Sequence, residues 1–171
     1  MVSVALVILT IAAALVLGGV QPASGNIEGV VTFGAPQGHQ EGPLTYPQTP
    51  PAGGVHNPAW QNCGMYDQPI PNEKAVHSQE HGAVWITYQP DLPADAIAKL
   101  RDLVRGRNFA LLSPYPNLPT PVVASAWGVQ LKVDGADDPR LSTFLSRYMQ
   151  GPQTPELGAP CTGGVGAPVE S

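Results

Sequence analysis

The chain has 171 residues, a net charge of −5 and only 12% charged residues. This length allows one globular domain with some residues left over. Because no cluster of Lys and Arg is present to neutralise phosphates, we expect no nucleic-acid partner. The 19 glycines and 20 prolines predict many turns and long ordered loops, with regular structure in the minority.

The first twenty residues are almost unbroken Ala, Val, Leu and Ile without a charge. About 20 such residues are needed to cross ~30 Å of hydrocarbon as a helix. We therefore predict a single-pass membrane anchor over residues 1–21, with a cleaved signal peptide as the alternative. In both cases the body of the protein lies outside the cytoplasmic membrane, anchored to it or secreted.

Residues 22–35 are predicted to be a linker that contains a short strand, because Ile27, Val30, Val31 and Phe33 alternate modestly with polar or small residues. Residues 36–62 are rich in proline and glycine and cannot hold a helix of useful length. Loops this long are usually functional or disordered. Tyr46 and Trp60 indicate a packed loop, since disordered segments are poor in aromatic residues.

The rest of the chain predicts a small α+β domain over residues 36–161, with a mixed or antiparallel sheet backed by two helices. We expect strands at 83–89, 108–114 and 122–133, the last interrupted by Gly128. The first helix is expected to begin at an Asp91 N-cap, and the second at Asp137 or Asp138. This order also occurs in the second half of thioredoxin-like folds. Residues 162–171 are expected to form a flexible tail.

The two cysteines, Cys63 and Cys161, are far apart in the sequence. In an exported protein such a pair usually forms one disulfide that closes a long loop. We therefore expect these two residues to be joined.

All four histidines lie between residues 39 and 81, and two of them flank a carboxylate in His77-Ser78-Gln79-Glu80-His81. Imidazole binds zinc, copper, nickel and iron, and a thioether shifts the preference towards copper, above all Cu(I). We predict a metal site with copper as the first choice and zinc as the second. Its proposed ligands are His56, His77 and His81, completed by Met65 or His39. Glu80 is a further ligand or, with Tyr66, a side chain that orients the ligands.

Three other interpretations remain open. The segment His77–His81 fits the His-x-x-Glu-His pattern of one class of zinc peptidases, which requires a helix. A strand pattern after Gly82 and a proline at 71 leave room for only a very short helix. Alternatively, Tyr46, Trp60, Tyr66 and Trp85 line a groove for a partner in a non-catalytic envelope protein. The histidines could also be hydrogen-bonded loop residues.

Several short segments together resemble a bacterial family called domain of unknown function 3105. They are Pro50–His56, Gly64–Tyr66, Val76–Gly82, Ser113–Pro119, Ala124–Gly128, Pro155-Glu156 and Cys161. The chain departs from the pattern at Gln79, where leucine is commoner, and at Ala52-Gly53, where Thr-Ser is more usual. The resemblance implies a membrane-anchored or secreted protein and leaves its chemistry open.

We therefore expect an extracytoplasmic, membrane-anchored protein that handles a metal ion by sequestration, by delivery or by helping to assemble a metalloprotein partner. We expect binding rather than catalysis. A partner-binding or structural envelope domain is the alternative, and a zinc-dependent hydrolase comes third.

Overall fold

A computed structural model describes residues 26–170 of the chain. The predicted anchor at 1–21 and the first part of the linker lie outside these residues. Among the residues that are described, no helix is both long enough and apolar enough to span a membrane.

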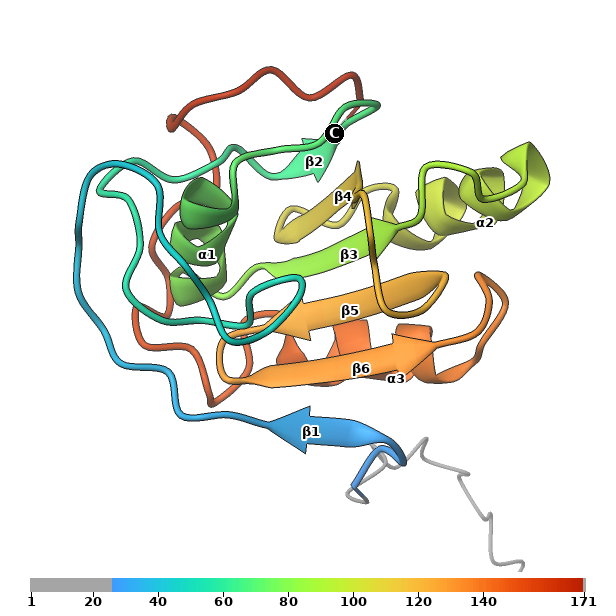
Figure 1. The fold of residues 1–171 in the computed structure, drawn as a ribbon, viewed down its shortest axis with the longest axis horizontal. Coiled ribbons are helices and arrows are strands. Elements are labelled where there is room, and N and C mark those ends of the chain that lie inside the picture. The colour runs from blue at the N-terminus through green and yellow to red at the C-terminus, as the bar shows by residue number, and fades with distance from the viewer. Residues whose placement is uncertain (1–25, 171) are drawn as a thin grey trace, which may run out of the picture.

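Six strands form one mixed sheet in the order β1-β6-β5-β3-β4-β2 (Figure 1). Their bounds are β1 Val30–Thr32, β2 Gly64–Met65, β3 Val84–Tyr88, β4 Ala110–Pro114, β5 Val122–Ala126 and β6 Val129–Val133. Strand β4 runs parallel to both β3 and β2, whereas β5, β6 and β1 continue the sheet in antiparallel pairs. The predicted strand over 122–133 is thus a hairpin of two strands. Its turn contains Gly128, whose φ of +70° suits a residue without Cβ.

Helices α2 (Ala94–Val104) and α3 (Arg140–Tyr148) cover one face of the sheet. Side chains of a strand alternate between its two faces, so Val84, Ile86 and Tyr88 of β3 point the same way. They belong to a large apolar cluster with residues of both helices, including Leu100, Val104, Leu141, Phe144 and Leu145. This layer is the main hydrophobic core, and its helices are the two that the sequence predicts.

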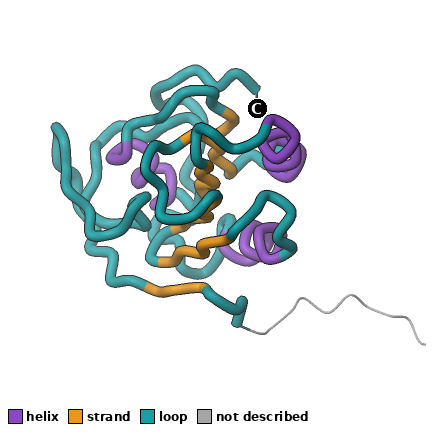
Figure 2. The backbone as a smooth tube through the Cα atoms, turned by 45° about the vertical axis from the view of Figure 1, so that its right-hand side comes forward, coloured by secondary structure: helices purple, strands orange, loops and turns teal. Residues whose placement is uncertain are grey.

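A third helix, α1 (Asn72–Glu80), lies on the opposite face together with the long loops (Figure 2). Trp85 and Leu111 point towards it from the sheet and pack in a smaller cluster with Ala75. The expectation of only two helices is therefore wrong. Helix α1 follows Pro71 and ends before Gly82, whose φ of +95° terminates the helix.

The start of the first predicted helix differs from expectation, whereas Asp138 lies at the start of the second as predicted. Helix α2 begins after Pro93, three residues past Asp91, and has no side-chain cap. Near the start of α3, the Oδ1 atom of Asp138 accepts a hydrogen bond from the backbone N–H of Arg140. Asp138 also pairs with the Arg140 guanidinium, which holds the pKa of that carboxyl below its usual range.

The C-terminal segment is attached to the body, contrary to the expected flexible tail. The N–H of Val169 donates to the carbonyl of Met65, and the N–H of Met65 donates to the carbonyl of Glu170. The disulfide between Cys63 and Cys161 is confirmed and ties the same two parts of the chain together. The predicted tail thus extends the pairing at the β2 edge.

Candidate metal centre

Helix α1 brings the central motif to one side of the molecule. Residues three and four apart are neighbours on a helix surface. His77 and Glu80 therefore lie together with His81, the residue that follows the last residue of α1. The imidazole rings of His77 and His81 are 4.6 Å apart, centroid to centroid. All three side chains are buried. The sequence left room for only a very short helix at this motif, and α1 is a helix of nine residues that carries the motif as far as Glu80, with His81 as its C-cap.

The other two histidines reach the same place from the loop over residues 36–62. His39 and His56 pair through their backbones, and the ring of each lies within 5.0 Å of the His77 ring. The loop is fixed to the helix by Gln79, whose amide donates to the Pro51 carbonyl and accepts from the Gly53 N–H. Gln79 and Ala52-Gly53 are the places where the chain departs from the resembled pattern, so the two departures meet in one contact.

Three of the histidines are oriented by the same kind of hydrogen bond. Nδ1 of His56 lies 2.7 Å from the carbonyl oxygen of Gly54, and Nδ1 of His77 lies 2.7 Å from that of Asn57. Nδ1 of His81 lies 2.7 Å from the carbonyl oxygen of Pro160. A carbonyl only accepts, so each Nδ1 carries the hydrogen and donates it. The lone pair of each neutral ring is therefore on Nε2, which is the arrangement that metal-binding histidines require.

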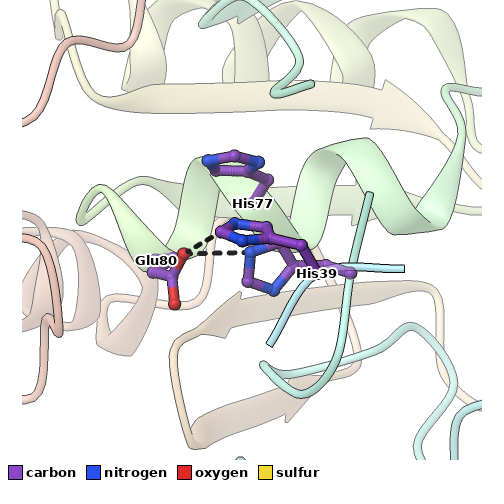
Figure 3. A group of neighbouring side chains, drawn as sticks. His39, His77 and Glu80 are labelled. Atoms are coloured by element: carbon purple, nitrogen blue, oxygen red, sulfur yellow. Dashed lines mark ion pairs between the residues drawn. The ribbon is translucent and has the colours of Figure 1, made fainter. Parts of the chain in front are cut away.

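The free ring nitrogens converge on a carboxylate. One nitrogen from each of His39, His56 and His77 and one oxygen of Glu80 all lie within 4.8 Å of one another. Nε2 of His56 is 2.9 Å from Oε2 of Glu80, and Nε2 of His39 is 3.7 Å from the same oxygen. Figure 3 shows the side chains of His39, His77 and Glu80 gathered beside α1. We refer to this group as the inner site.

The two closest ligand atoms of the inner site have unsatisfied hydrogen-bonding capacity. Within residues 26–170, neither Nε2 of His56 nor Oε2 of Glu80 has a hydrogen-bond partner, although both atoms are buried. Since Nδ1 of His56 holds the ring hydrogen, two lone pairs face each other at 2.9 Å. Buried lone pairs in this arrangement require a cation between them, either a proton or a metal ion.

Burial disfavours the charged form of each side chain, the imidazolium of His56 and the carboxylate of Glu80. It lowers the pKa of His56 and raises the pKa of the Glu80 carboxyl. It also lowers the pKa of His77 to about 4, against a hydrogen bond to Asn57 that acts in the opposite direction. His77 is therefore neutral at physiological pH, which is the form that binds metal.

His81 faces a different carboxylate. Its Nε2 lies 3.5 Å from Oε2 of Glu156, and these two residues form a second group with His77. The sequence reasoning did not identify Glu156 as a ligand, although Pro155-Glu156 is one of the segments that carry the family resemblance. It also missed the orienting carbonyls of Gly54, Asn57 and Pro160, for which no side-chain signal exists.

The predicted ligand Met65 lies elsewhere. Its strand pairs Met65 with Leu112, and both side chains belong to the main apolar core on the α2 and α3 face. The histidines lie on the α1 face, so the structure removes Met65 from the candidate ligands. Tyr66, predicted to orient the ligands, packs near the disulfide and donates its hydroxyl hydrogen to the carbonyl of Asn62 at 2.6 Å.

Comparison with known protein families places most of the chain in one of them. Comparisons with curated proteins and with solved structures found no match. Residues 39–163 match the family described as "Protein of unknown function (DUF3105)". The matched segment begins at His39 and ends just beyond Cys161, so it contains all four histidines, Glu80 and Glu156. The chain therefore belongs to this family.

Proposed function

We propose that the protein binds a divalent transition-metal ion through His39, His56, His77 and Glu80. The observation that carries this proposal is the buried pair of atoms His56 Nε2 and Glu80 Oε2, which lie 2.9 Å apart and have no hydrogen-bond partner among the described residues. A bound cation satisfies both atoms at once. The preset Nδ1 hydrogen bonds fix the rings before the ion arrives and so lower the cost of binding it.

Three imidazoles and one carboxylate favour particular ions. The placement of Met65 removes the thioether that pointed to Cu(I). Among divalent ions, a site of nitrogen and oxygen ligands generally binds Cu²⁺ more tightly than Zn²⁺. We therefore propose Cu(II) as the first candidate and zinc as the second, with zinc in a four-coordinate arrangement.

The proposed role is metal handling outside the cytoplasmic membrane. The disulfide supports this location, because disulfides persist in oxidising compartments. We also propose that the unit β3-α2-β4 with the following hairpin and α3 has the thioredoxin-like topology expected from the sequence. The β4-β3-β5-β6 order supports that assignment at the level of fold alone.

A zinc hydrolase is the second candidate, because α1 supplies the helix that the His-x-x-Glu-His pattern requires. In that mechanism the glutamate acts as a base on a metal-bound water. Here the Glu80 side chain is only 4% exposed and its Oε2 lies against His56, which favours a ligand role. Release of a peptide or ester product by the zinc-loaded protein, abolished by Glu80→Gln, would support hydrolysis instead.

The direct test is metal content and affinity. Untagged full-length protein is purified, stripped with a chelator and titrated with Cu(II) and Zn(II) by calorimetry, with elemental analysis before stripping. We expect one ion per chain, weaker binding in Glu80→Gln and loss of tight binding in His77→Ala. Glu41→Gln is the matched control, because Glu41 is an exposed carboxylate of the same loop region. Equal affinity in all four proteins would refute the proposal.

A further inference from the structure

We infer that the protein has a second, overlapping metal position formed by His77, His81 and Glu156, which we call the outer site. This inference rests on the proposed function and extends it. A single ion would occupy either the inner or the outer site, with His77 as the ligand that both have in common.

The outer site has the geometry of a ligand group in its own right. One atom from each of His77, His81 and Glu156 lies within 4.8 Å of the other two. His81 is buried and oriented by the Pro160 carbonyl, so its Nε2 lone pair points to the Glu156 carboxylate. The Glu156 side chain is 51% exposed, which gives this position contact with solvent.

His77 cannot serve two ions at the same time. Its Nδ1 donates to the carbonyl of Asn57, so only one lone pair, on Nε2, remains for a metal. With His77 bound at the inner site, the outer site retains only His81 and Glu156. The two positions therefore exclude each other, and the expected stoichiometry is one ion per chain.

The two sites are built by different parts of the chain that meet at the end of α1. The ligands His39 and His56 come from the loop before the helix. Glu156 comes from the segment after α3, and its N–H donates to the carbonyl of Glu80, 3.0 Å away. The same segment supplies the Pro160 carbonyl next to the disulfide at Cys161. An ion that changes position would pass from the loop segment to the C-terminal segment while His77 holds it.

Two tryptophans report differently on the two positions, because Trp127 lies next to an inner ligand and Trp60 lies next to ligands of both positions. The Trp127 ring is 5.7 Å from that of His56, an inner ligand. The Trp60 ring is 5.1 Å from that of His81 and 5.6 Å from that of His77. Bound Cu(II) quenches nearby indole fluorescence, so an ion at the inner site should quench both indoles and an ion at the outer site should quench mainly Trp60. Trp85 is present in both the Trp127→Phe and the Trp60→Phe background, so the difference between the two backgrounds identifies the occupied position.

The experiment titrates Cu(II) into the stripped full-length protein and into His56→Ala, Glu80→Gln, His81→Ala and His77→Ala, in both tryptophan backgrounds. We expect the wild type to bind one ion. His56→Ala and Glu80→Gln should still bind one ion more weakly, retaining quenching of Trp60 and losing that of Trp127. His81→Ala should retain quenching of Trp127, and His77→Ala should lose tight binding at both positions. Glu80→Gln preserves side-chain shape and so covers the case in which His56→Ala fails to fold.

The possible failures are distinguishable. If folded Glu80→Gln binds no Cu(II) while the wild type binds one ion, the outer site does not exist and the proposed function stands. Two ions bound to the wild type would overturn the mutual exclusion. Absence of Cu(II) and Zn(II) binding in the wild type itself would refute the proposed function.

Discussion

The two faces of the sheet are built in different ways. The face under α2 and α3 is held by apolar side chains at regular spacing, such as Leu100 and Phe144. The face under α1 buries polar groups, including His56, Gln79 and Glu80, and holds its loops by hydrogen bonds between side chains and backbone. The comparison indicates that the first face supplies stability and the second supplies a preorganised binding site.

The largest expected loss of stability comes from removing a buried side chain on the apolar face. Phe144→Ala should destabilise the protein by about 3–5 kcal/mol, because it removes a fully buried ring and leaves a cavity. Urea unfolding in the presence of a chelator measures the change, with the exposed Leu157→Ala as control. The folded fraction should retain its metal stoichiometry, and a loss of stoichiometry would show that the two faces are not separable.

Removing the disulfide should cause the next largest loss of stability, and it should act on the α1 face. The bond closes a loop with a sequence separation of 98 residues. Replacing Cys63 and Cys161 together by serine should cost about 2–5 kcal/mol in unfolding free energy. Because Pro160 orients His81, the variant should also lose Trp60 quenching at the outer site in a Glu80→Gln background. Retention of that quenching would show that the outer site forms without the disulfide.

Acid should destabilise the metal-free α1 face through His77. Its pKa is about 4 in the folded protein and about 6.5 when unfolded. Between these values the unfolded chain binds the proton and the folded chain does not, so stability falls as the pH falls. We expect a loss of about 2 kcal/mol from pH 7 to pH 5. Urea unfolding of His77→Asn at both pH values isolates this contribution, and an equal loss in the variant would contradict it.

A smaller effect is expected where the loop is fixed to the helix. Gln79→Leu restores the commoner residue of the family pattern but leaves the Gly53 N–H without its acceptor. We expect a loss of about 1–2 kcal/mol in unfolding free energy. The exposed Gln68→Leu is the matched control. A Gln79→Leu protein as stable as the wild type would show that the loop adjusts without this contact.

The apolar face could be predicted from the sequence because its elements carry a clear period. Residues such as Ile97, Leu100 and Val104 repeat at helical spacing, and β3 is a continuous apolar run. Helix α1 lacked such a signal. Its residues from Ala75 to Glu80 are all buried, so no contrast between a polar and an apolar face marks the helix.

The candidate site could be predicted only in part. The histidines and Glu80 were identified because their residue types suit metal ions and lie close in the sequence. Glu156 is 76 positions after Glu80, and only the fold brings them together. Met65 was misplaced because sequence proximity to the histidines does not say which face of a strand a residue occupies.

The most direct test is anomalous diffraction from crystals of the full-length protein soaked in Cu(II) or Zn(II). We expect one anomalous peak per chain, at about 2.0–2.2 Å from Nε2 of His77 and from at least one carboxylate, Glu80 or Glu156. A structure without such a peak, in which a proton alone joins His56 to Glu80, would contradict it.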